Sequence, residues 1–184
     1  MQLILASQSP RRRELLSEAG IKFSVVPSLF EEKGEELTPE ETVLHFSAGK
    51  AEEVFHRCPG AAVLGADTVV ALDGEIFGKP HTEDGAKAML RRLSGRTHSV
   101  FTGVCLIYGG VKKQGIFETR VTFFELPEEF IERYVREVRP LDKAGAYGIQ
   151  DGYQIVKSYE GSYTNVVGLP MELVREYLKE AKIC

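Results

Sequence analysis

The sequence predicts an α/β fold in which an elongated mixed β-sheet is flanked by helices. Strand-like and helix-like segments alternate along the chain, as in proteins that cover a sheet with helices. The first three segments follow the order strand, helix, strand, which is typical of a parallel βαβ unit. Two long strand-like segments, 97–108 and 111–125, flank Gly109-Gly110 and predict antiparallel neighbours. A sheet with both kinds of pairing is therefore expected.

The first strand and helix have clear boundaries. Residues 2–6 are mostly apolar and predict the strand. Ser9 suits the N-cap of the helix because its hydroxyl accepts an orphan backbone N–H, and Pro10 suits the first helical position because it has no N–H to lose. Gly20 is expected to end this helix, and residues 22–26 form the second predicted strand.

The later elements follow from capping and turn signals. Thr38-Pro39-Glu40-Glu41 matches a capping box, so a helix is expected from there to about residue 57. Asp73-Gly74 is a typical two-residue hairpin turn. The other expected elements are strands at 61–72 and 75–77, helices at 83–93 and from 127, a glycine-containing loop at 139–152, a hairpin around Glu160-Gly161, and a closing helix at 170–181.

Length and composition limit the class of protein. A chain of 184 residues is long enough for one well-packed core, so a single domain over residues 1–184 is expected. The net charge of -4 argues against a general nucleic-acid binder. The longest apolar runs are strand-sized, which argues against a membrane protein. No basic segment precedes the first apolar residues, so a secretory signal is not expected and the cytoplasm is the expected location.

The cysteines and histidines do not predict a metal site. Cys58, Cys105 and Cys184 are odd in number and far apart, which argues against a disulfide framework and against a Cys-rich zinc site. The four histidines lack the spacing that would place two of them on one helix face as ligands. We expect most of them to be surface or structural residues.

The segment after the first strand has the chemistry of an anion site. Ser7 and Ser9 supply hydroxyl groups, and Arg11, Arg12 and Arg13 add guanidinium groups at the start of the helix. The free N–H groups and positive dipole end of a helix favour anions, and arginine forks match phosphate oxygens. A polyanionic ligand is therefore expected. The alternative is that the arginines only solvate the outer helix face, because successive residues point in different directions.

Carboxylates mark two further positions. Asp67 interrupts an otherwise apolar strand, where an unpaired charge would be costly to bury. It either binds a divalent cation or activates a water molecule, or it is a strand-end acid paired with a Lys or Arg. Glu31 and Glu32 lie in an acidic loop with Glu35 and Glu36. They could approach the same cation, or they are simply solvated.

Two lysines and one loop add candidate ligand contacts. Lys50 follows Gly49, and Lys79 lies between Gly78 and Pro80; such small or rigid neighbours let an ammonium group reach a phosphate. The alternative is that both are surface lysines. The loop 142–150 contains small residues that permit close backbone approach and ends at Gln150, whose amide is able to read a base edge. Alone, the loop could be only a structured turn.

Five motifs follow one another in a distinctive order. They are Ser-x-Ser-Pro-Arg-Arg at 7–12, Gly-Ala-Asp-Thr at 65–68, Gly-Lys-Pro at 78–80, Leu-Ser-Gly at 93–95 and Asp-Lys-Ala-Gly-Ala-Tyr-Gly-Ile-Gln at 142–150. Together they closely resemble the Maf family of nucleoside triphosphate pyrophosphatases, from the first strand to about residue 170. The resemblance implies an inosine triphosphatase-like α/β fold with a deep cleft between two lobes. It also implies hydrolysis between the α and β phosphates, and the last motif is similar to the branch that acts on dTTP and UTP; a sister branch prefers 7-methyl-GTP.

The resemblance implies roles for single residues. Asp67 matches the family's proton acceptor, which activates the attacking water. The matches to its specificity positions are Arg11, Thr68 and Gln150, and the matches to its phosphate and metal site are Ser7, Arg12, Glu31, Lys50 and Lys79. The implied cofactor is Mg²⁺ or Mn²⁺, held by Glu31, Asp67 and phosphate oxygens. The implied substrate is a nucleoside triphosphate, and a homodimer is the expectation for a small enzyme.

One departure from the family pattern concerns the helix that carries Lys50. Gly49 stands where a polar or charged residue is common in relatives, and a glycine inside a helix costs about 1 kcal/mol relative to alanine. The role-bearing positions all match, so an active enzyme is expected. The alternative is a nucleotide-binding regulator of cell division or septum formation, an association suggested by the family, in which hydrolysis is incidental.

Overall fold

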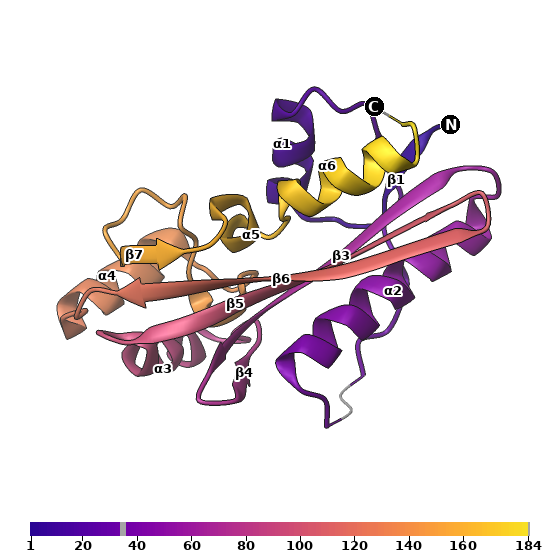
Figure 1. Ribbon diagram of the computed structural model, residues 1–184. Coiled ribbons are helices and arrows are strands. Elements are labelled where there is room, and N and C mark those ends of the chain that lie inside the picture. Colours follow the sequence, from indigo (N-terminus) through magenta and orange to yellow (C-terminus); the bar gives the residue numbers. More distant parts are fainter. Residues whose placement is uncertain (34–35, 184) are drawn as a thin grey trace.

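The computed structural model describes residues 1–33 and 36–183. Figure 1 shows the elements, which in chain order are β1 (Leu3–Leu5), α1 (Pro10–Glu18), β2 (Ser24–Val25), α2 (Pro39–Arg57), β3 (Ala62–Leu72), β4 (Glu75–Phe77), α3 (Glu83–Leu93), β5 (Thr97–Tyr108), β6 (Val111–Phe123), α4 (Glu128–Val138), the 3-10 helix η1 (Ala144–Ala146), β7 (Val156–Glu160), α5 (Tyr163–Val167) and α6 (Met171–Glu180). Glu35 and Cys184, both considered in the sequence, lie outside the described residues. In the part of the chain that the structure describes, none of the helices combines the length and the apolar character of a membrane span.

The strands form one mixed sheet. Its order is β2-β1-β3-β5-β6-β7, with the short strand β4 paired to β3 beside this path. Strand β1 runs parallel to β2 and β3, whereas the pairs β3–β5, β5–β6 and β6–β7 are antiparallel. The expected α/β class, the opening βαβ unit and the antiparallel hairpin are all confirmed.

The two ends of the sheet carry different apolar clusters. At one end, α1 and α6 pack on one face and α2 packs on the other (Figure 1). At the other end, α3, α4 and η1 enclose a cluster that includes Phe123 and Tyr134. The long strands β3 and β5 contribute to both ends. Side chains from the two halves can therefore meet near the middle of these strands.

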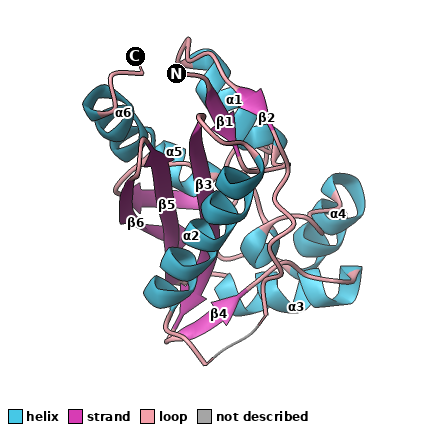
Figure 2. Cartoon of the chain, turned by 90° about the vertical axis from the view of Figure 1, so that its right-hand side faces the viewer, coloured by secondary structure: helices cyan, strands magenta, loops and turns pink. Residues whose placement is uncertain are grey.

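Glycines bring α2 unusually close to the sheet. A Cβ atom at Gly65 would lie 2.3 Å from the Ser47 carbonyl oxygen, and one at Gly103 would lie 2.2 Å from the Val43 carbonyl oxygen. Gly103 is also the register partner of Asp67 across the β3–β5 pair. Figures 1 and 2 both show α2 running along these strands. The close approach allows a side chain of α2 to reach the middle of β3.

Most expected boundaries agree with the structure, because they depend on local signals. Ser9 caps α1, and Thr38 and Glu41 form the reciprocal hydrogen bonds of a capping box at the start of α2. The hairpin expected around Glu160-Gly161 is wrong. Strand β7 is followed by the short helix α5, whose N-cap Ser162 accepts a hydrogen bond from the Asn165 N–H.

The physical reason for that error is a tertiary contact. Gly161 has a φ of 131°, and a Cβ atom there would lie 2.7 Å from Thr119 Oγ1 on β6. Ser162 and Thr119 also exchange hydrogen bonds of 3.0 and 3.2 Å. The chain is thus held against the sheet at a point where the glycine suggested a free turn.

Candidate active site

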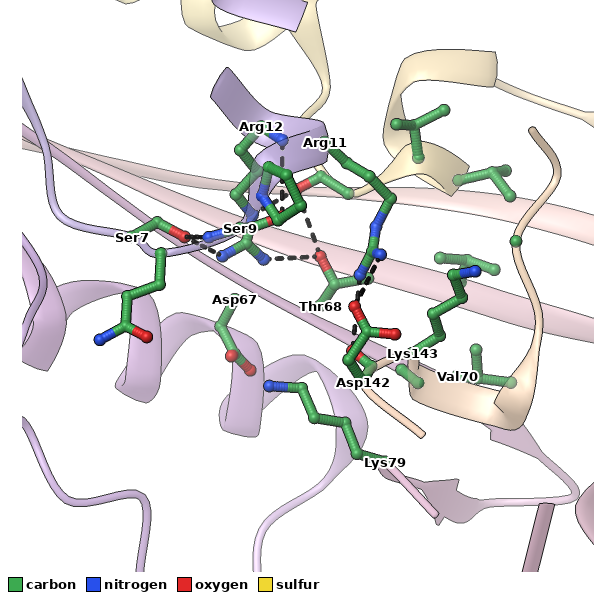
Figure 3. Close-up of a pocket in the computed structure, with 18 of the residues that line it drawn as sticks. Ser7, Ser9, Arg11, Arg12, Asp67, Thr68, Val70, Lys79, Asp142 and Lys143 are labelled. Carbon is green, nitrogen blue, oxygen red and sulfur yellow. Dashed lines mark hydrogen bonds and ion pairs between the residues drawn. The ribbon is translucent and has the colours of Figure 1, made fainter. Parts of the chain in front are cut away.

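A cleft of about 450 Å³ lies where the two halves of the molecule meet. Its walls come from the β1–α1 connection, α2, the middle of β3, the β4–α3 connection, the loop 142–151 and the end of α5 (Figure 3). The residues proposed from the sequence that line it are Ser7, Arg11, Arg12, Lys50, Asp67, Thr68, Lys79 and Gln150. The fold thus brings together residues from the whole length of the chain.

The acidic loop contributes Glu32 to the cleft, whereas Glu31 is not among the lining residues. The Glu31 side chain is 71% exposed and pairs with Lys33 at 2.5 Å. Glu32 instead pairs with Lys50 at 2.6 Å. The sequence marked both acids, but a loop without periodicity holds no signal that tells which of two neighbours points inward.

Lys50 joins two carboxylates from different parts of the chain. Its Nζ lies 2.7 Å from Asp67 Oδ1 and 2.6 Å from Glu32 Oε1. Partial burial opposes ionisation of Glu32, but the charge and hydrogen bond of Lys50 outweigh it and lower the pKa of Glu32 below its ordinary value. Figure 3 shows the ammonium group of Lys79 directed toward Asp67 as well. Two acids and two cations therefore meet at this end of the cleft.

The start of α1 supplies the polar wall beside these acids. Ser9 caps the helix, and Ser7 Oγ accepts hydrogen bonds of 3.2 Å from the Ser9 N–H and from Arg12 Nη1. The cap leaves the positive end of the helix facing the cleft, as an anion site requires. The sequence prediction of this helix start is confirmed.

Arg12 connects four backbone or side-chain acceptors around the cleft floor. Its Nε donates to the Gly168 carbonyl at 2.8 Å, and Nη1 donates to the Ala66 carbonyl at 2.9 Å. Nη2 donates to Thr68 Oγ1 at 3.1 Å. Ala66 and Thr68 flank Asp67, so the guanidinium group holds the strand segment that carries this acid. Arg12 is only partly buried, and the rest of its surface faces the cleft.

Arg11 crosses the cleft to the loop 142–151. Its Nη1 lies 3.0 Å from Asp142 Oδ2, and its Nη2 donates to the Asp142 carbonyl at 3.4 Å. Gln150 is exposed at the rim of the same loop. Figure 3 shows Arg11, a specificity candidate, on the side of Thr68 and Val70, away from Asp67.

The end of the cleft away from Asp67 combines apolar and polar side chains, and Figure 3 shows Val70 there beside Lys143. Val100, Val166 and Tyr147 also line the cleft. Tyr147 OH lies 2.8 Å from His98 Nε2, and burial lowers the pKa of His98 to about 4, so this histidine is neutral at pH 7 and has a structural role. A flat apolar group could occupy this end while an attached anion reaches the cations at the other.

Gly49 explains how the acidic loop is held on α2. A Cβ atom at position 49 would lie 2.3 Å from the ring of Phe30, so the bare glycine surface receives this ring. Glu53 on the same helix accepts hydrogen bonds from Ser28 Oγ at 3.0 Å and from the Leu29 N–H at 2.8 Å. These contacts position the following residues, so that Glu32 reaches Lys50. The departure at Gly49 is therefore a packing requirement of this chain.

Replacing Gly49 by alanine is expected to destabilise the protein by about 1 kcal/mol, although alanine is the better helix former. The helix gains about 1 kcal/mol, but displacing the Phe30 ring costs about 1–3 kcal/mol. The temperature of thermal unfolding measures the sum. The double change Phe30→Ala and Gly49→Ala is the control: relative to Phe30→Ala alone, it should be more stable. A Gly49→Ala protein that unfolds at a higher temperature than the parent would contradict this packing.

The two acids of the cleft could bind a divalent cation only if a bound substrate supplied further oxygen ligands. The described residues hold no group of three or more His, Cys, Asp or Glu side chains that could bind a metal ion by themselves. Glu32 and Asp67 supply two carboxylates, both within reach of Lys50. Mg²⁺ sites that act on phosphates commonly use one or two carboxylates and complete the shell with phosphate oxygens and water. The donor set fits that kind of site.

The fold and the cleft define an α/β protein with a helix N-terminus, basic side chains and two carboxylates in a cleft that also contains apolar side chains. This is the class of site that suits a nucleotide. The family model described as "Maf-like protein" matches residues 2–181. The chain belongs to the Maf family.

Curated relatives and a solved structure extend this result. The chain is 49% identical over 183 residues to a protein of Thermotoga maritima named dTTP/UTP pyrophosphatase, covering 98% of this chain and 89% of the relative. It is 47% identical to a Bacillus velezensis protein of the same name, covering 99% and 97%. Its fold resembles the Staphylococcus aureus Ham1 protein with a TM-score of 0.54 and 17% identity, covering 98% of this chain and 100% of that one. The last likeness confirms the expected fold.

Proposed function

We propose that this protein is a nucleoside triphosphate pyrophosphatase that hydrolyses dTTP and UTP to the monophosphate and pyrophosphate. The relatives that share nearly half of its residues carry this name. The observation that supports it most directly is the Asp67–Lys50–Glu32 cluster beside the start of α1. This cluster places carboxylates and cations together at the polar end of a cleft whose other end is able to hold a base.

The proposed reaction breaks the anhydride bond between the α and β phosphates. Water adds its oxygen to phosphorus, its proton passes to the Asp67 carboxylate, and pyrophosphate leaves. Lys50, Lys79 and the N-terminus of α1 offset the negative charge that gathers on the phosphate oxygens. The Asp67 carboxylate also orients the water by accepting a hydrogen bond from it before the proton is transferred.

A divalent cation is part of this proposal. Asp67 and Glu32, with phosphate oxygens of the substrate, would hold Mg²⁺ or Mn²⁺, which would supply further positive charge where the leaving pyrophosphate forms. We retain Glu31 only as a candidate that would have to turn inward from its contact with Lys33. Oxygen ligands suit both ions, so the donor set does not select between them.

The test is pyrophosphate release from dTTP, UTP, CTP, GTP, ATP and 7-methyl-GTP, with Mg²⁺ or Mn²⁺ and with a chelator. We expect turnover of dTTP and UTP that falls about 100-fold or more when the metal is removed, since the protein cations alone then offset the charge on the leaving group. Turnover that survives chelation would contradict the metal site. Tight nucleotide binding without turnover would contradict the enzyme and favour a nucleotide-binding regulator.

A further inference from the structure

The loop that carries Gln150 is closed by a buried polar network. Its turn spans residues 148–151, with the Asp151 N–H donating to the Gly148 carbonyl at 3.2 Å. Gln150 lies within this turn and is exposed at the rim of the cleft. Whatever holds the two ends of the turn therefore also sets the backbone position from which the Gln150 side chain extends.

Asp151 is the centre of this network. Its carboxylate is only 14% exposed and accepts hydrogen bonds from Lys143 Nζ at 2.8 and 3.0 Å. It also accepts one of 2.6 Å from the hydroxyl of Tyr134, a fully buried residue of α4. The same hydroxyl accepts a hydrogen bond of 3.2 Å from the Gly148 N–H. The start, the middle and the end of the loop are thus joined to one helix.

The backbone is shaped around the carboxylate. A Cβ atom at Gly148 would lie 2.7 Å from Asp151 Oδ1 and 2.8 Å from Oδ2, so the acid folds directly beneath the turn. A second contact anchors the loop further back, where a Cβ at Gly145 would lie 2.9 Å from Val70 on β3. The turn has little freedom to move without breaking these contacts.

The energetics of buried ion pairs indicate the role of the Lys143–Asp151 pair. Taking a lysine and an aspartate out of water costs about as much as their attraction returns, so a buried pair contributes little net stability. Removing one partner, by contrast, leaves the other charge uncompensated. Lys143 also lines the cleft, and Asp151 neutralises its charge there. The pair is therefore better suited to fixing a conformation than to stabilising the fold.

We propose that Asp151 is a positioning residue for base selection: through Lys143 and Tyr134 it fixes the turn that presents the Gln150 amide to the base. This inference rests on the proposed function, because it assigns a nucleotide base to the cleft. Asp151 also lines the cleft, but its carboxylate is engaged by Tyr134 and Lys143. Its effect on selection passes through Gln150.

The experiment compares kcat and KM for UTP and CTP in the parent, Asp151→Asn, Gln150→Ala and the double variant. CTP differs from UTP only at a hydrogen-bonding edge of the base, where an amide would read it. We expect Asp151→Asn to reduce the preference for UTP in kcat/KM about tenfold, chiefly through a higher KM for UTP, which is the effect expected for the loss of one hydrogen bond. In the Gln150→Ala background, Asp151→Asn should change the preference no further, because the two act as one unit.

Two further variants separate this role from general destabilisation. Tyr134→Phe removes only the hydroxyl and should shift the preference in the same direction as Asp151→Asn, which keeps the test open if the Asp151 variant folds poorly. Glu137→Gln is the matched control, since Glu137 pairs with the hydroxyl of Tyr153 in another tyrosine–carboxylate contact of α4. This control should leave the preference unchanged.

The outcomes distinguish this inference from the proposed function. Additive effects of Asp151→Asn and Gln150→Ala, or equal losses for both nucleotides, would overturn the positioning role. A parent that hydrolyses neither dTTP nor UTP would overturn the proposed function instead. If the parent shows no turnover, titration calorimetry would measure the affinity of each variant for the same two nucleotides. The ratio of the two affinities would then replace the ratio of kcat/KM values and would still test the role of Asp151.

Discussion

Replacing Asp67 by asparagine is expected to lower turnover of dTTP about 10³-fold while nucleotide affinity falls by less than about tenfold. The amide has the shape of the carboxylate but cannot take the proton of the attacking water. Lys50 keeps its 2.6 Å contact with Glu32, so the cationic end of the cleft stays in place. Single-turnover kinetics and titration calorimetry, applied to the same preparation, measure the two quantities separately.

The control for Asp67 is Asp84→Asn on α3, whose side chain is 97% exposed. It makes the same chemical change away from the cleft and should alter neither turnover nor affinity. Equal losses of turnover and affinity in Asp67→Asn would mean that Asp67 serves in binding or structure rather than as the proton acceptor. Turnover close to that of the parent would exclude any chemical role for this carboxylate.

Arg12→Lys is expected to lower the free energy of unfolding by about 2–3 kcal/mol and to reduce turnover as well. One ammonium group cannot replace a fork that reaches the carbonyls of Ala66 and Gly168 together with Thr68. Each buried acceptor left without a donor costs about 1–3 kcal/mol. Turnover should fall because the strand segment around Asp67 loses its support.

Thermal unfolding and turnover of Arg12→Lys can be compared with those of Arg136→Lys. Arg136 lies on α4, and its side chain is 72% exposed, so the same exchange there should change neither quantity measurably. An Arg12→Lys protein with the stability of the parent and a weaker affinity for triphosphate would contradict the supporting role. It would show instead that Arg12 acts on phosphate alone.

The sequence predicted the local architecture because local architecture has local causes. Ser9 and Pro10 mark the start of α1, and the capping box at Thr38 marks the start of α2, through contacts within four residues. The turn at Asp73-Gly74 joins β3 and β4 for the same kind of reason. The pattern of strands and helices also predicted the fold class, and the order of the motifs predicted most of the residues that meet in the cleft, although not Glu31.

Other features could not be predicted because they depend on contacts between distant segments. The contact of Phe30 with Gly49 sets which acid of the loop reaches Lys50, and no spacing in the sequence encodes that choice. The same holds for α5, which replaces the expected hairpin because Gly161 lies against Thr119. Such contacts depend on how elements pack and on strand register.

By itself, the sequence determined the α/β class, most of the element boundaries and the chemical groups available to the site. Only the tertiary structure decided how those groups are used. Arg12 donates hydrogen bonds to Ala66 and Thr68, which lie 54 and 56 positions further along the chain. Asp151 joins Lys143 to Tyr134 next to Gln150. Local patterns reflect the preferences of neighbouring residues, whereas hydrogen bonds between distant segments exist only after the core has packed them together.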